Sequence, residues 1–130
     1  MKEEIENWLQ FASEDLRLAE LAQSEDIYNQ VCFHAQQCAE KVLKAFILQR
    51  GKIHPQTHRL SDLLNHLGKN VFKELQEDII SLDRFYILTR YPDALPGSLP
   101  QGLPTKRNAE KALDIAKSVF KRAQEVLAKS

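Results

Sequence analysis

The stretch Ile27–Arg50, IYNQVCFHAQQCAEKVLKAFILQR, contains neither Gly nor Pro and is followed directly by Gly51. Such a run predicts a long α-helix that ends at the glycine, because Gly is preferred just past a helix C-terminus. At about 100° per residue, its apolar side chains fall on one broad arc: Val31, Cys32, Ala35, Cys38, Ala39, Val42, Leu43, Ala45 and Phe46. Because so wide an arc needs neighbours on several sides, we expect this to be the central helix of a bundle.

Polar residues recur along the same predicted helix at three- and four-residue spacing, which places them in one narrow stripe opposite the apolar arc. The residues of this stripe are Gln30, His34, Gln37, Lys41 and Lys44. Solvated surface or a dimer contact is the commoner role for such a stripe. The alternative is that it forms one wall of a binding site.

Apolar periodicity predicts four further helices, at Glu3–Gln23, Arg59–Leu67, Val71–Arg90 and Thr105–Lys129. The apolar face expected for the first of them consists of Ile5, Trp8, Leu9, Ala12, Leu16, Ala19 and Leu21. No segment shows a strand pattern, and no internal repeat is present. We therefore expect an all-α fold: an up-and-down bundle of four long helices and one short helix, forming a single domain over residues 1–130.

Capping residues help to set the predicted helix boundaries. Ser24 or Asp26 can accept hydrogen bonds from the free N–H groups at the start of the central helix. Thr57 can do the same for the short helix that follows. The connection between the first two helices is short, so these helices should pack as an antiparallel pair.

The segment Tyr91–Pro104, YPDALPGSLPQGLP, holds four of the five prolines and two of the four glycines of the chain. This composition predicts a long loop before the last helix, since neither helix nor strand tolerates it. Loops of this length in small domains are commonly functional. Its leucines and its tyrosine favour a loop that packs against the bundle.

Composition excludes several classes of protein. Lys plus Arg and Asp plus Glu both number 18, so the formal net charge is zero. This balance argues against stable nucleic acid binding and against adhesion to an anionic membrane. No apolar run approaches the roughly 20 residues of a membrane helix. The acidic, amphipathic start MKEEIENWLQ does not resemble a signal peptide.

The two cysteines, Cys32 and Cys38, lie on the same predicted helix. Six residues along a helix separate their Cα atoms by about 9 Å, too far for a disulfide. We expect both thiols to be small buried side chains of a protein in the reducing cytoplasm.

The four histidines are His34, His54, His58 and His66. A metal site at His54 and His58 is disfavoured, because Pro55 interrupts the helical spacing and no further ligand is close in sequence. We therefore expect no metal and no cofactor. The acidic pairs Glu3–Glu4 and Glu14–Asp15 point in different directions on a helix, and we interpret them as solvated surface.

The strongest candidates for a site combine two segments. His34, Gln37, Lys41 and Lys44 lie on the central helix, and Arg90, Tyr91 and Asp93 lie where the fourth predicted helix gives way to the loop. At a helix C-terminus a guanidinium can satisfy carbonyl groups, pair with an aspartate or bind a phosphate. The alternative is that Arg90 and Asp93 only fix the loop.

The run FHAQQCAEKVLKAFILQRGKIHPQTHRLSDLL, followed by FYILTRYPDAL, closely resembles the HEPN domain family. The matching pieces are Phe33–Lys44, Thr57-His58 with Leu60, Arg90–Asp93 and the helical run Ala12–Ala19. This resemblance implies a small helical bundle that forms a homodimer. It also implies a minimal nucleotidyltransferase partner, in some members as toxin and antitoxin, and a role in nucleotide binding.

One branch of this family consists of metal-independent ribonucleases whose motif is an Arg, four to six intervening residues, and then a His. After Arg90 this chain has Leu95, Pro96 and Gly97 at those places, and no histidine follows His66. Arg59 and His66 match this spacing, but they lie on the short predicted helix, which is not where the family's site is expected. The resemblance therefore favours a non-catalytic binding module, with two alternatives: a ribonuclease toxin and a structural dimerisation scaffold without a ligand.

Overall fold

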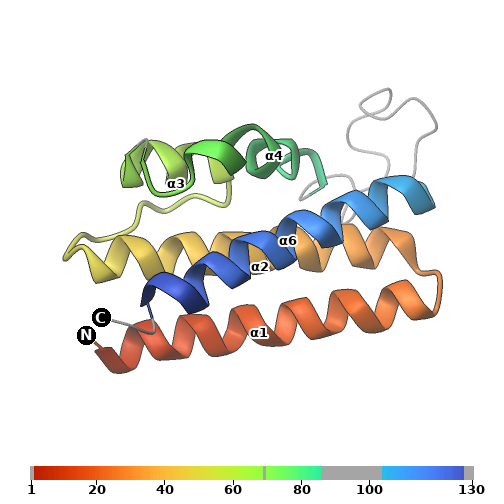
Figure 1. Ribbon diagram of the computed structural model, residues 1–130, viewed down its shortest axis with the longest axis horizontal. Coiled ribbons are helices and arrows are strands. Elements are labelled where there is room, and N and C mark those ends of the chain that lie inside the picture. Colours follow the sequence, from red (N-terminus) through yellow and green to blue (C-terminus); the bar gives the residue numbers. More distant parts are fainter. Residues whose placement is uncertain (1, 69, 86–103, 128–130) are drawn as a thin grey trace.

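In the computed structural model, which describes residues 2–68, 70–85 and 104–127, the protein is an all-helical bundle (Figure 1). The all-α class is thus confirmed. The helices are α1 (Lys2–Ser24), α2 (Tyr28–Gln49), α3 (Leu60–Leu67), the 3-10 turn η1 (Lys73–Leu75), α4 (Gln76–Ser81) and α6 (Lys106–Leu127).

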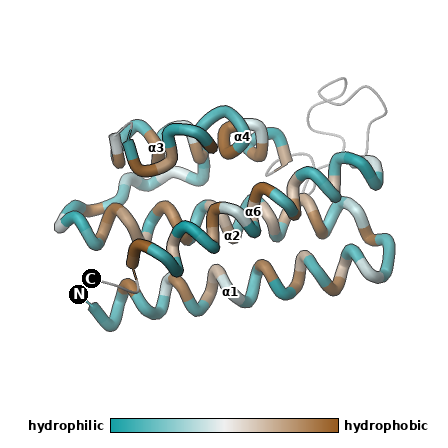
Figure 2. Tube along the Cα trace, in the orientation of Figure 1, coloured by the Kyte–Doolittle hydropathy of each residue, from teal (hydrophilic) through white to brown (hydrophobic). Residues whose placement is uncertain are grey.

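Helix α2 is the centre of the bundle, as the sequence predicts. It packs against α1, α6 and α3, with α1 on one side and the α3–α4 layer on the other (Figure 1). Figure 2 shows the alternation of apolar and polar residues along each helix that this packing requires. Every residue of the predicted apolar arc of α2 is at most 1% exposed.

Gly51 ends α2 in the predicted way. Its φ of 75° is in the left-handed region, which costs a glycine no steric strain. The N–H of Gly51 donates to the carbonyl of Leu48 at 2.9 Å, and the N–H of Lys52 donates to that of Ile47 at 3.2 Å. This pair of hydrogen bonds is the Schellman motif, which satisfies carbonyl groups left free at a helix end.

The predicted cap at the start of α2 is wrong. The N-cap residue is Ile27, and no side chain caps the helix there. Asp26 instead has a positive φ of 60° and ends α1, a conformation that Asp tolerates better than most residues. The hydroxyl of Ser24 donates back to the carbonyl of Leu21 at 2.7 Å. Leu21 itself is 54% exposed and does not belong to the buried face of α1.

Helix α3 is capped from a distance. Its first N–H groups, on Leu60 and Ser61, donate to the carboxylate of Asp83 at 2.6 and 3.2 Å. Thr57, the predicted cap, accepts a hydrogen bond from the N–H of Arg59 at 3.1 Å, just before the helix. The helix therefore depends on a tertiary contact that local sequence does not reveal.

The helix predicted at Val71–Arg90 is not continuous. The chain forms the 3-10 turn η1 and the short helix α4, turns at Leu82 and Asp83, and is helical again at Arg84 and Phe85. These tighter turns carry Asp83 to the N-terminus of α3, so a tertiary requirement overrides the helical periodicity. The remainder of this predicted helix and the predicted loop at Tyr91–Pro104 lie outside the described residues.

No helix within the described residues is both long enough and apolar enough to cross a membrane. Both cysteines are free and fully buried, in agreement with the prediction that they act as core side chains.

Burial raises the pKa of the Cys32 thiol to about 12 and also raises the pKa of Cys38. At pH 8 almost no reactive thiolate is then present in the folded protein. We expect neither cysteine of the native protein to react with Ellman's reagent within minutes, whereas urea-unfolded protein should release two equivalents of the coloured thiolate. Rapid labelling of either thiol in native protein would contradict this account of the core.

Candidate functional site

The buried carboxylate of Asp15 joins α1 to the polar stripe of α2. Asp15 is only 6% exposed. Its Oδ1 lies 2.9 Å from Nδ1 of His34, and its Oδ2 is bonded to Nζ of Lys41. His34 and Lys41 are seven residues apart, so both project from one face of α2. The interpretation of Asp15 as solvated surface is wrong, because α1 turns this residue toward α2 while its neighbour Glu14 is exposed.

The two partners of Asp15 remain accessible. The side chain of His34 is 21% exposed and that of Lys41 is 23% exposed. The cluster therefore consists of one buried carboxylate and two side chains whose nitrogen atoms lie near the surface. Such an arrangement fixes the direction of both side chains, because a buried carboxylate must keep its hydrogen-bond partners.

Lys44 lies away from this cluster. It is 8% exposed, and its Nζ lies 2.9 Å from Oε2 of the buried Glu40. The same ammonium group lies 5.3 Å from the centre of the Trp8 ring, in a cation–π contact. Lys44 was predicted to share the polar stripe, but the fold turns it into the protein, where its charge is matched by Glu40.

Glu40 also binds the loop that leads to α3. Nδ1 of His58 lies 3.1 Å from Oε2 of Glu40, and the backbone carbonyl of His58 accepts a hydrogen bond from the amide of Gln36 at 3.0 Å. Gln37, one of the predicted site residues, donates to the side-chain carbonyl of Gln36 at 2.7 Å. A network of polar contacts thus links the stripe to this loop.

The remaining histidines do not form a shared site. His54 packs edge-on against Trp8, with ring centres 5.5 Å apart. Arg59 and His66 stand at opposite ends of α3, roughly 10 Å apart along the helix axis. Among the residues that the structure describes, no three His, Cys, Asp or Glu side chains are grouped to hold a metal ion.

The second half of the predicted site, Arg90, Tyr91 and Asp93, lies outside the described residues. The structure therefore brings together His34 and Lys41 through Asp15. It joins Gln37 to Gln36 instead, and it separates Lys44 from the Asp15 contacts.

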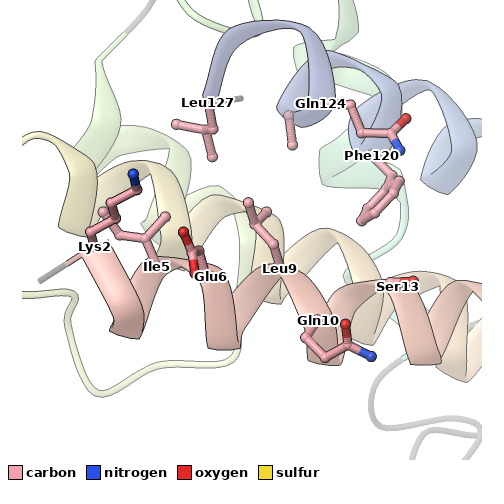
Figure 3. A pocket seen from close by; sticks show the side chains of 10 residues that line it. Lys2, Ile5, Glu6, Leu9, Gln10, Ser13, Phe120, Gln124 and Leu127 are labelled. Atoms are coloured by element: carbon pink, nitrogen blue, oxygen red, sulfur yellow. The ribbon is translucent and has the colours of Figure 1, made fainter. Parts of the chain in front are cut away.

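A groove of about 880 Å³ lies elsewhere, between α1 and α6. Figure 3 shows Ile5 and Leu9 of α1 facing Phe120 and Leu127 of α6 across it. Of the predicted site residues that the structure describes, none lines this groove.

Sequence reasoning missed both buried carboxylates, although a signal for Asp15 exists. Asp15 is three residues after Ala12 and four before Ala19, both fully buried, so it falls on the apolar face of α1. An acidic residue on such a face needs a partner, and the polar stripe of the neighbouring helix is the nearest source of one.

Solved structures resemble this chain over nearly its whole length. A protein from Thermus thermophilus is 37% identical with a TM-score of 0.80, covering 93% of this chain and 96% of its own. An archaeal HEPN homologue is 30% identical with a TM-score of 0.74, covering 93% and 95%. An HEPN domain protein from Thermotoga maritima is 25% identical with a TM-score of 0.75, covering 95% and 99%.

The chain is also similar in sequence to a known protein and to a protein family. A Methanocaldococcus jannaschii protein named "Putative toxin" is 30% identical over 120 residues, 84% of this chain and 78% of that one. The HEPN domain family matches residues 5–126. Fold and site together define a small helical-bundle domain with a polar stripe on its central helix. The chain belongs to the HEPN domain family.

Replacing Asp15 with alanine should destabilise the fold. The substitution removes the acceptor of two hydrogen bonds and leaves two partly buried nitrogen groups unpaired, at a cost of about 2 kcal/mol in the free energy of unfolding. Urea denaturation followed by circular dichroism measures this cost. The matched control is Glu14→Ala, whose exposed side chain should contribute less than about 0.5 kcal/mol. Equal effects of both substitutions would show that the Asp15 contacts do not stabilise the fold.

Proposed function

We propose that this protein is an HEPN-domain binding module that forms a homodimer, acts with a nucleotidyltransferase partner as a toxin–antitoxin-like pair, and holds a nucleotide on the polar stripe of α2. The observation that carries the proposal is the Asp15 cluster, which holds His34 and Lys41 side by side at the surface of the central helix.

The nucleotide part rests on the chemistry of this cluster. Lys41 keeps donor hydrogens beyond the one it gives to Asp15, because an ammonium group has three. These hydrogens can bind a phosphate group. In this proposal Gln37 extends the polar surface, Arg90 adds a second phosphate ligand, Tyr91 stacks on the base and Asp93 orients Arg90. Lys44 contributes indirectly, as the buried counter-ion of Glu40.

The homodimer part rests on an apolar surface beside the stripe. Phe11 and Leu18 of α1 are 51% and 46% exposed. They stand four residues before and three residues after Asp15, on the same side of the helix. Large apolar side chains next to a polar site are typical of a surface that another protein covers. A second copy placed there would shield the nucleotide from solvent.

The toxin part rests on the relative from M. jannaschii that carries the name "Putative toxin". The ribonuclease alternative would need a general acid or base near an arginine. Arg59 and His66 do not support this alternative, because they lie at opposite ends of α3. The scaffold alternative predicts a dimer that binds no nucleotide.

Calorimetric titration of the purified protein with AMP, ATP and GTP tests the nucleotide part. We expect saturable binding that Lys41→Ala weakens at least tenfold, because the substitution removes a charge-assisted contact with phosphate. Arg90→Ala should have the same effect. The matched control is Lys121→Ala, an exposed lysine of α6, which should bind like the unchanged protein.

Two results would overturn the proposal. No heat of binding up to millimolar nucleotide would favour the scaffold alternative. Equal loss of affinity in Lys41→Ala and Lys121→Ala would indicate unspecific attraction of the phosphate to positive charge rather than a site on α2.

A further inference from the structure

The contact with Asp15 fixes where the proton of the His34 ring lies. Lys41 occupies Oδ2 of Asp15, and Nδ1 of His34 lies 2.9 Å from Oδ1. A carboxylate paired with an ammonium group can only accept hydrogen bonds, so Nδ1 must donate. In the neutral imidazole ring the other nitrogen, Nε2, then carries no hydrogen and is an acceptor.

Nε2 of His34 is open to a ligand. Among the described residues, none forms a hydrogen bond with Nε2 of His34. Nε2 is also not one of their buried polar atoms that lack a partner, so it is accessible from solvent. The ring packs edge-on against Phe33, with ring centres 5.2 Å apart, so its orientation is held on that side as well. The site therefore offers one fixed acceptor beside the ammonium group of Lys41.

An acceptor and an ammonium group select different parts of a ligand. A phosphate oxygen also accepts hydrogen bonds and gains nothing from an unprotonated Nε2, whereas it pairs well with Lys41. Because both side chains contact one carboxylate, the donor that reaches Nε2 must lie close to the phosphate. In a nucleotide the donors nearest to the phosphate are the ribose hydroxyl groups, whatever the base.

We propose that His34, held by Asp15, recognises a ribose hydroxyl, and that the site therefore prefers ribonucleotides to their deoxy analogues. This inference rests on the proposed nucleotide site and names the class of ligand that it takes. Asp15 acts as a positioning residue, since its carboxylate binds His34 and Lys41 and thereby sets which ring nitrogen accepts.

The first test compares AMP with 2′-deoxy-AMP and 3′-deoxy-AMP by calorimetry. We expect at least one deoxy analogue to bind about tenfold more weakly, the loss that one solvent-accessible hydrogen bond allows. In His34→Ala the three ligands should bind equally well. The matched control is His66→Ala, an exposed histidine of α3, which should keep the preference.

The second test observes the ring directly. Two-bond ¹H–¹⁵N spectra at pH 8 should show the proton on Nδ1 of His34. In Asp15→Asn the new amide can donate to Nδ1, which moves the proton to Nε2. This conservative variant should therefore lose the preference for ribose while it still binds the phosphate through Lys41.

The outcomes separate this inference from the proposed function. Equal binding of all three ligands, or a proton on Nε2 in the unchanged protein, overturns the inference and leaves the nucleotide site intact. Failure of all three ligands to bind overturns both.

Discussion

A buried carboxylate must be paired, and in this protein that constraint determines the arrangement of the central helix. Asp15 lies on the face of α1 that packs against α2 and cannot be reached by enough water to stay solvated. The carboxylate has its hydrogen-bond partners only when His34 and Lys41 of α2 lie at the same level along the helix axis as Asp15. The register between these two antiparallel helices is therefore coupled to the geometry of the polar stripe.

A second buried carboxylate works in the same way on another side of α2. Glu40 contacts Lys44 from its own helix and His58 from the loop before α3. Asp15 thus pairs with His34 and Lys41, whereas Glu40 pairs with Lys44. One group remains at the surface, where it can meet a ligand, and the other holds the loop and α3 against the bundle. Two lysines three residues apart thus have different environments and, in our proposal, different functions.

The sequence predicts the central helix and its apolar arc well, because one long periodic segment without Gly or Pro leaves few alternatives. The end of this helix at Gly51 is also predictable, since a left-handed residue is needed there. The cap of α3 by Asp83 is not, because it depends on a residue more than twenty positions away. Asp15 and Lys44 were misplaced for the same reason: their environment depends on the neighbouring helix as much as on their own.

The arrangement of the stripe depends above all on the contact of Asp15 with Lys41 across the interface of α1 and α2. A double-mutant cycle measures this interaction directly, from the free energies of unfolding of Asp15→Ala, Lys41→Ala and the double variant in urea. We expect a coupling energy of about 1 to 2 kcal/mol, since each single substitution leaves the other group without its partner. Additive effects of the two substitutions would contradict this expectation.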